Sequence, residues 1–283
     1  MDVFLKGVKF EVDDSRSEPP LFILSVRKSG STMLNKACRQ LAHHNNWKFV
    51  DVPAAMFANN IPASDWIREP TLKDIVRPGN VYGGFRNFPA GMAAAELFVS
   101  GRKVLLVRDP RDALVSEYFS NAYSHRIPAG KGGARARLLA QRKAARHQSI
   151  DDYVLKRVPL MKRTLAEYLP LLDDPNTLTV KYEDVIFDKG KMIDRIVGHF
   201  GWTCAPDVRK AVIDAIDIIP RQEDRKEFIR KVIPGDHREK LSAHTIERIN
   251  RDLSEIHAAF GYASALAPSY ADSRLPAQRA GSP

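Results

Sequence analysis

Short, wholly apolar runs alternate with amphipathic segments along this chain. Uninterrupted apolar or β-branched residues predict buried strands, and such runs lie at 21–26 (LFILSV), 47–52 (WKFVDV), 81–85, 103–107 (KVLLV) and 177–182 (TLTVKY). Apolar residues three or four positions apart predict helices at 32–45, 92–99, 112–122, 189–200, 206–217 and 241–260, and a long helix at 150–172 that Pro159 interrupts. This alternation predicts an α/β fold with a central, mostly parallel sheet flanked by helices on both faces.

No linker separates the predicted elements, so residues 1–263 are expected to form a single domain. Residues 1–20 mix charges and end in two prolines, which predicts an irregular or edge-strand lead-in. Residues 264–283 are rich in Ala, Ser and Pro without periodicity, and we expect a flexible tail there. A basic, mobile insertion is expected at about 126–149, and its second half favours a helix.

The chain has 283 residues, with 44 Lys and Arg against 34 Asp and Glu and a formal net charge of +10. This excess indicates anionic partners: nucleic acid, anionic lipid, or small molecules that carry phosphate or sulfate. Cys38 and Cys204 are the two cysteines, which argues against a disulfide scaffold or a Cys-rich zinc site. No apolar run approaches the ~20 residues of a membrane span, and the N-terminus does not resemble a secretory signal. A cytoplasmic protein is therefore expected.

A turn rich in Ser and Gly follows the first buried strand, over Ser25–Met33 (SVRKSGSTM). The free N–H groups at the start of the next helix, together with Lys28 and nearby hydroxyls, would cradle an anion at the carboxyl end of the strand. This P-loop-like arrangement is not a Walker A motif, because Lys28 precedes Gly30. A Ser-rich helix N-cap beside a solvated Arg–Lys pair explains the segment equally well.

The strand at 103–107 runs directly into Arg108–Ser116 (RDPRDALVS). Arg108 would face the same crevice as the first turn, and a guanidinium beside a hydroxyl suits a phosphate. Asp109 or Asp112 is expected to cap the following helix, with Pro110 in its first turn. Pairing of the arginines with these aspartates explains the segment slightly better when the segment is taken alone.

Together the two segments resemble the cytosolic sulfotransferases, which use 3′-phosphoadenylyl sulfate (PAPS). The first resembles their P-K-S-G-T-T-W loop, and the second matches R-x-x-x-D-x-x-V-S-x-Y at each defined position. A third segment at 228–238 (FIRKVIPGDHR) resembles F-x-R-K-G-x-x-G-D-W-K, and 181–184 (KYED) resembles the family's Y-E-D. The motifs occur in the family's order.

The resemblance implies where the donor binds. The residues implied to hold the 5′-phosphosulfate are Arg27, Lys28, Ser29, Gly30, Ser31, Thr32 and Met33. Those implied to hold the 3′-phosphate are Arg108, Ser116, Arg230 and Lys231, with Tyr182 near the adenine. We expect the phosphate to bind there because so much positive charge has no other evident partner.

Three positions depart from the family's pattern. Met33 replaces the tryptophan that stacks on adenine, and Val232 replaces the glycine of the third motif. Asn87 stands where many members carry the histidine that deprotonates the acceptor, and an amide can orient a hydroxyl but cannot take its proton. The expected catalytic residues are Lys28 at the leaving oxygen, Arg86 at the sulfuryl oxygens, Asn87 as a positioning group and His125 as a base, with Asp51 and Glu96 as other candidate bases.

The implied activity is sulfuryl transfer from PAPS to a hydroxyl or amine acceptor, with release of 3′,5′-ADP and without a metal. The acceptor is expected to be a small metabolite or a saccharide. The basic insertion would attract an anionic acceptor, although a solvated loop is the commoner role of such a segment. A homodimer is compatible with the sequence, and no nucleic-acid-binding motif is present. The alternatives are a P-loop-type nucleotide kinase or NTPase, a nucleic-acid binder, and a sulfotransferase homologue that binds nucleotide without catalysis.

Overall fold

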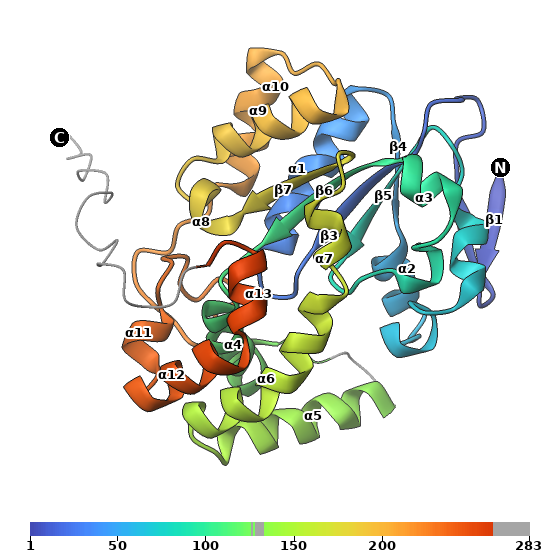
Figure 1. Cartoon of the computed structure of the whole chain (residues 1–283). Coiled ribbons are helices and arrows are strands. Elements are labelled where there is room, and N and C mark those ends of the chain that lie inside the picture. The colour runs from blue at the N-terminus through green and yellow to red at the C-terminus, as the bar shows by residue number, and fades with distance from the viewer. Residues whose placement is uncertain (126, 128–132, 263–283) are drawn as a thin grey trace.

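The computed structural model describes residues 1–125, 127 and 133–262. A five-stranded parallel sheet forms the centre of the molecule, in the order β4–β5–β3–β6–β7 (Figure 1). Its strands are β3 (Leu21–Ser25), β4 (Lys48–Asp51), β5 (Asn80–Phe85), β6 (Arg102–Val107) and β7 (Thr177–Lys181). The predicted fold and the five predicted strands are confirmed. Because the strands are parallel, their carboxyl ends meet at one edge of the sheet.

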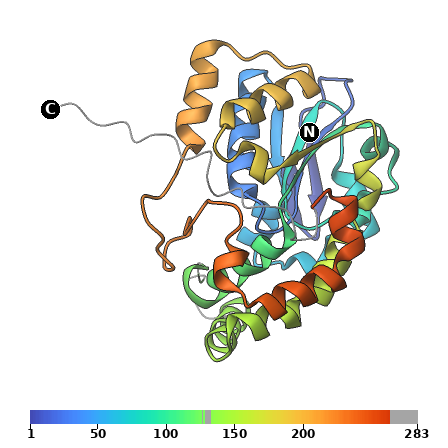
Figure 2. The same cartoon turned by 60° about the vertical axis from the view of Figure 1, so that its left-hand side comes forward.

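The central strand β3 is buried on both faces, as its uninterrupted apolar sequence predicts. Leu21 and Ile23 belong to a core cluster with α1 (Ser31–His44), α9 (Lys189–Phe200) and α10 (Pro206–Ile216). Phe22 and Leu24 belong to a larger cluster on the other face. Its helices are α2 (Val52–Ala58), α3 (Glu96–Ser100), α4 (Pro110–Phe119), α6 (Ile150–Ala166), α7 (Leu169–Leu172), α12 (Ala243–Asp252) and α13 (Ser254–Ala259). In Figure 2, α1 (blue) and the C-terminal helices (red) lie on opposite sides of the sheet.

The lead-in before β3 forms a separate antiparallel hairpin, β1 (Asp2–Leu5) and β2 (Val8–Glu11). Its two-residue turn has positive φ at Lys6 (48°) and Gly7 (78°), as a tight hairpin requires. The described chain also contains the helix α5 (Gly133–Arg146). Its shorter elements are 3₁₀ turns at Ala63–Asp65, Pro70–Ile75 and Ala90–Met92, a π-helical turn at Ser120–Ser124, α8 (Tyr182–Val185) and α11 (His237–Lys240).

The predicted interruption at Pro159 is wrong, because α6 continues through this residue. Pro159 is exposed, so the hydrogen bond that it cannot donate is lost on the solvent side, while the apolar face of α6 packs on the core. Ser149 also caps the helix by accepting from the N–H of Asp152.

Three other predicted helices differ in extent. The segment 92–99 holds the end of a 3₁₀ turn and part of the short α3, and 241–260 divides at Leu253 into α12 and α13. The helix predicted at 112–122 begins at Pro110, with Asp109 as its cap, and continues into the π-helical turn. The helix favoured in the basic insertion is α5, whereas the start of that insertion and the tail at 264–283 lie outside the described residues.

Candidate active site

A cavity of about 240 Å³ opens at the carboxyl ends of β3, β5, β6 and β7. It is lined by all of the predicted site residues except Ser29, Asn87 and the two other candidate bases, Asp51 and Glu96. The loop after β3 and the start of α1 line it together with residues of α4 and of the segment at 228–232. The topology therefore brings together three motifs that are far apart in the sequence.

The turn between β3 and α1 has positive φ at Lys28 (66°) and at Gly30 (93°). A Cβ at Gly30 would lie 3.1 Å from the ring of Tyr182, so glycine is required both by its conformation and by this close approach. Gly30 is the N-cap of α1 and provides no side-chain cap. The N–H groups of residues 31–33, which begin α1, consequently have no acceptor within the described chain and can bind an anion.

Ser29 has a structural position instead of the predicted place in the donor site. Its hydroxyl lies 2.6 Å from the carbonyl oxygen of Val26 and 3.1 Å from that of Leu106. The side chain is fully buried, so this hydroxyl anchors the turn to β6. A seryl hydroxyl can donate one hydrogen bond, and here the backbone carbonyls accept it, so the hydroxyl is not available to donate to a ligand.

Lys28 projects into the cavity, with its Nζ atom 6.0 Å from the ring centre of Phe228. Burial lowers the pKa of Lys28 to about 8, and the positive charge of Arg27 acts in the same direction. Glu117 partly opposes this shift. Lys28 is therefore still mostly protonated at neutral pH.

Arg108 leaves the end of β6 and is almost completely buried. Its guanidinium stacks 4.4 Å from the ring centre of Tyr182, and Nη1 donates to the carbonyl oxygen of Lys28 at 3.3 Å. The Nε atom is buried and has no hydrogen-bond partner in the described chain. A buried donor without an acceptor is costly, so this group is suited to a ligand that supplies one.

Asp112 joins α4 to the loop before α11. It accepts hydrogen bonds from the backbone N–H groups of Gly235 (2.7 Å) and His237 (3.0 Å), and Nδ1 of His237 lies 2.7 Å from Oδ1. Burial disfavours the charge of Asp112, but the contact with His237 and the nearby Arg108 outweigh burial and lower its pKa to about 2. An ionised Asp112 thus holds the two parts of the site together.

The expectation that the cations of the third motif have no other partner is wrong. Arg230 pairs with Glu223 and Asp236, and its guanidinium stacks 4.1 Å from the ring centre of Phe119. Lys231 pairs with Asp236 at 3.1 Å and with Glu239 at 2.7 Å. Asp236 is buried and belongs to the same motif, so the loop carries its own counter-charge. Both cations still line the cavity, as Arg108 and Ser116 do.

A model of the sulfotransferase domain family matches residues 18–261. The chain belongs to this family. The mouse sulfotransferase SULT7A1, complexed with PAP, has a similar fold, with 12% sequence identity and a TM-score of 0.55 over 93% of this chain and 99% of its own. Retinol dehydratase, in complex with androsterone and the inactive cofactor PAP, has 15% identity and a TM-score of 0.52 over 85% of this chain and 81% of its own. No curated protein sequence matches the chain.

Family membership confirms that the protein is a sulfotransferase, which transfers a sulfuryl group, and it confirms the expected fold. In this sulfotransferase, Met33 lines the cavity at the position of the family's tryptophan. Val232 also lines the cavity, and its carbonyl oxygen accepts a hydrogen bond from the hydroxyl of Tyr182 at 2.9 Å. This contact fixes the ring of Tyr182 between Gly30 and Arg108.

His125 is the candidate base that the sulfotransferase places in its cavity. It follows the π-helical turn after α4, and its backbone N–H donates to the carbonyl oxygen of Ser120 at 2.7 Å. Burial lowers the pKa of His125 below its usual value, and Lys28 and Arg27 act in the same direction. The imidazole is therefore neutral at pH 7 and able to accept a proton.

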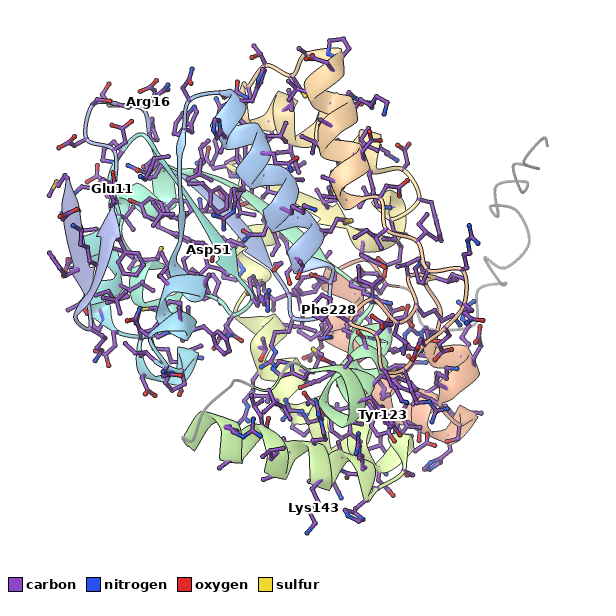
Figure 3. All side chains as sticks on the ribbon, turned by 180° about the vertical axis from the view of Figure 1, so that it is seen from behind. Glu11, Arg16, Asp51, Tyr123, Lys143 and Phe228 are labelled. Atoms are coloured by element: carbon purple, nitrogen blue, oxygen red, sulfur yellow. The ribbon has the colours of Figure 1, made fainter. Side chains whose placement is uncertain are left out.

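The other candidate residues lie outside the lining of the cavity. Asp51 caps α2 by accepting from the N–H of Ala54 at 3.0 Å, and it also accepts from Asn35 (2.8 Å) and Arg39 (2.6 Å); Figure 3 shows it at the end of β4. Glu96 is exposed on α3, which precedes β6 and so lies toward the amino ends of the strands. Asn87 follows Arg86 in a bend, and Arg86 alone of the two lines the cavity.

The sequence did not indicate two residues that help to build the candidate site. Glu117 is the one carboxylate among the described residues that line the cavity, and Arg157 on α6 pairs with it at 2.6 Å. Glu117 directly follows Ser116 of the second motif, and this adjacency could have identified it as a candidate site residue. His237 was also missed, because the family has a tryptophan there and the contact with Asp112 depends on the tertiary fold.

In the described ranges, no helix is both long and apolar enough to cross a membrane. Within the same ranges, no group of three or more His, Cys, Asp or Glu side chains is placed to hold a metal ion.

Proposed function

We propose that this sulfotransferase uses PAPS as its donor, transfers the sulfuryl group to a hydroxyl or amine group of a small metabolite or a saccharide, and releases 3′,5′-ADP. The observation that carries the proposal is that one cavity is lined by two sets of groups suited to anions. Lys28 and the free N–H groups of α1 form the first, and Arg108, beside Ser116 and Arg230, forms the second. Such a cavity suits a nucleotide that is anionic at both its 5′ and its 3′ positions.

The residues present fit such a donor. The Nε atom of Arg108 is buried without an acceptor, and a phosphate oxygen would supply one. The N–H groups at the start of α1 likewise have no acceptor in the described chain, and the helix dipole favours negative charge there.

PAPS would supply the sulfuryl group on an activated phosphosulfate linkage. Lys28 would neutralise the charge that develops on the leaving oxygen, and Arg86 would hold the peripheral sulfuryl oxygens. His125, neutral at pH 7, would accept the proton of the acceptor. Positioning and charge stabilisation would provide most of the rate enhancement, as in phosphoryl transfer.

We propose further that residues 1–263 form one sulfotransferase domain. The family match begins at residue 18. The hairpin of β1 and β2 nevertheless contributes Val3, Leu5, Val8 and Phe10 to the larger core cluster, so it belongs to the same folding unit.

Nucleotide titration tests the donor assignment. The protein should bind 3′,5′-ADP at least about 10-fold more tightly than 5′-AMP, because a charge-assisted contact contributes about 1.5–3 kcal/mol. Label should pass from ³⁵S-labelled PAPS to the acceptor and should continue to do so in excess EDTA, whereas a nucleotide kinase would transfer no label from PAPS and would require Mg²⁺ for its own reaction. Equal affinity for the two nucleotides would contradict the proposal.

A further inference from the structure

The groups proposed to bind the two ends of the donor differ in how their positive charge is balanced. At the proposed 3′-phosphate end, Arg108 lies beside Asp112, and Arg230 and Lys231 share Asp236. At the transfer end, by contrast, Arg27, Lys28 and Arg86 make no ion pair with any residue in the described ranges. The transfer end is therefore the more strongly positive part of the cavity.

The one carboxylate among the described residues that line the cavity does not compensate for this charge, and Asp51, which acts on Arg86 from outside the lining, is already paired with Arg39. Glu117 pairs with the guanidinium of Arg157 at 2.6 Å, so its negative charge is already matched. The same excess acts on His125, whose pKa is lowered first by burial and then by Lys28, Arg27, Arg142 and Arg86. Four cations thus act on the imidazole: Lys28, Arg27 and Arg86 line the same cavity, and Arg142 contacts the backbone of His125.

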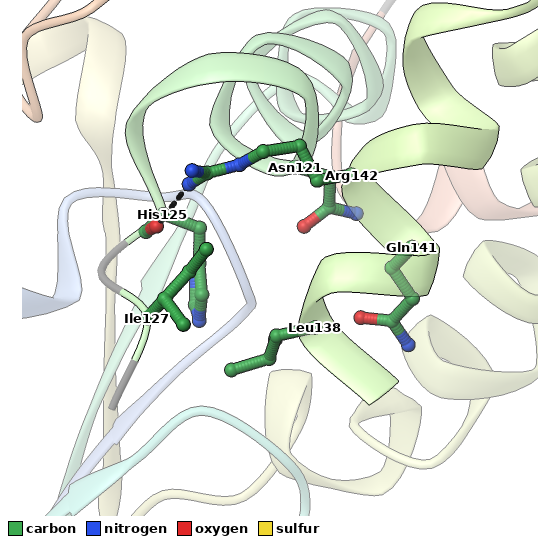
Figure 4. A pocket seen from close by; sticks show the side chains of 6 residues that line it. All are labelled: Asn121, His125, Ile127, Leu138, Gln141 and Arg142. Atoms are coloured by element: carbon green, nitrogen blue, oxygen red, sulfur yellow. Dashed lines mark hydrogen bonds between the residues drawn. The ribbon is translucent and has the colours of Figure 1, made fainter. Parts of the chain in front are cut away.

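A small side pocket, without room for a water molecule in this structure, adjoins this positive region. It shares Asn121 and His125 with the main cavity and is also lined by Gln141 and Arg142 of α5 (Figure 4). Arg142 donates to the carbonyl oxygen of His125, which fixes its guanidinium at the entrance. The Lys and Arg residues of α5, which contains no Asp or Glu, are Arg135, Arg137, Arg142, Lys143 and Arg146.

We propose that the acceptor of this sulfotransferase carries a negatively charged group, a carboxylate, sulfate or phosphate, next to the hydroxyl that is sulfated, and that Arg27 and Arg142 bind this group, beside Arg86 at the sulfuryl oxygens. The proposal rests on the proposed function. Lys28, Arg86 and the N–H groups of α1 are assigned to the phosphosulfate, so Arg27 and Arg142 are left to face the acceptor. Without them an anionic acceptor would be repelled by the donor, and with them it is attracted.

The negative group would also assist the proton transfer. An anion beside His125 favours the imidazolium and raises its pKa toward neutrality, which makes the imidazole a better base. A neutral acceptor would not raise the pKa of His125 in this way. Affinity for the acceptor and the rate of proton transfer therefore both favour an anionic acceptor.

Matched acceptor pairs test this proposal. Methyl β-D-glucuronide and its carboxamide differ in the charge of one group, as do 4-hydroxyphenylacetate and 4-hydroxyphenylacetamide. The first pair tests a saccharide acceptor and the second a phenolic one. Transfer from ³⁵S-labelled PAPS at saturating donor should favour the anionic member of at least one pair by about 10-fold in kcat/KM. Added salt should reduce this preference.

Arginine variants locate the effect. Arg27→Gln should reduce the preference within a pair about 5- to 10-fold, and because the preference is a ratio at saturating donor, any effect on donor binding cancels. Lys143→Gln is the matched control, since Lys143 is exposed on the outer side of α5 and its loss should leave the ratio unchanged (Figure 3). Arg142→Lys keeps the charge and should retain more of the preference than Arg142→Gln.

Two results would overturn the inference. One is equal or better use of the neutral members, and the other is no use of either anionic member at millimolar concentration. In both cases the affinity for 3′,5′-ADP is measured on the same sample. Tight binding of 3′,5′-ADP would then leave the proposed function standing while the anionic acceptor is rejected, whereas absence of that binding would reject the proposed function itself.

Discussion

The Nδ1 atom of His237 lies 2.7 Å from Oδ1 of Asp112, and this contact joins two parts of the donor site that are far apart in the sequence. Asp112 belongs to α4, which also carries Ser116. His237 follows directly after the loop that contains Arg230. The cations proposed to hold the 3′-phosphate can converge because this contact fixes the loop against the helix.

Breaking the contact should weaken 3′-phosphate binding selectively. We expect Asp112→Asn and His237→Phe to reduce the affinity for 3′,5′-ADP about 10-fold or more, while 5′-AMP, which lacks the 3′-phosphate, binds nearly as before. Calorimetric titration of both nucleotides measures the difference. His237→Gln, whose amide can still donate to Asp112, should lose less affinity, and His244→Gln on the exposed side of α12 is the control. An equal loss for both nucleotides would mean that the contact serves only folding.

Removal of the Lys28 charge should affect turnover far more than nucleotide binding. Lys28→Ala is expected to lower kcat about 10²-fold or more, since the ammonium is needed most when the leaving oxygen becomes charged. Its effect on the Kd of 3′,5′-ADP should stay within a few-fold. Single-turnover kinetics with labelled PAPS separates the two effects, and Lys28→Arg should recover part of the rate. Near-normal turnover of Lys28→Ala would show that another group neutralises the leaving oxygen.

The strands and the location of the cavity could be predicted from the sequence because each depends on local signals. An uninterrupted apolar run such as LFILSV has few alternatives to a doubly buried strand, and the residues that follow parallel strands must meet at one edge. The helix at Pro159 could not be predicted in this way. Its continuity depends on the side of α6 that faces solvent, which only the tertiary packing determines.

The charge balance of the site depended on tertiary contacts in the same way. Asp236 was visible in the third motif, but its pairing with Arg230 and Lys231 follows from the fold of the loop. Asn87 matched the family by its distance from Pro89, yet it lies outside the lining of the cavity, because adjacent residues in a bend point in different directions. Sequence spacing identified the motifs, while the direction of each side chain required the structure.

The buried carboxylate of Asp112 should make stability depend on acid. Its pKa is lowered to about 2 in the folded protein, so the folded state binds fewer protons than the unfolded state between this value and the ordinary 3.8. The resulting stabilisation, about 2 kcal/mol at most, is fully present above about pH 5 and is lost as the pH falls through the folded pKa. Urea unfolding of the wild type and Asp112→Asn should therefore differ at pH 6 and converge toward pH 2. A difference that stays constant with pH would mean that the charge of Asp112 does not contribute.

The pH dependence of turnover should identify the base. If His125 accepts the proton, kcat/KM should rise with pH through the pKa of His125, which lies below its usual 6.5, because only the neutral imidazole is active. It should fall again near pH 8, where Lys28, with its pKa of about 8, loses its charge. His125→Ala should reduce the rate about 10²- to 10⁴-fold and remove the acidic limb, with 3′,5′-ADP still bound.

Three other variants, Asp51→Asn, Glu96→Gln and Asn87→Ala, should keep that limb, since these side chains lie outside the lining of the cavity. If Asp51→Asn lost the acidic limb instead, Asp51 would be the base. Because Asp51 caps α2 in this structure, the cap would then have to open during turnover.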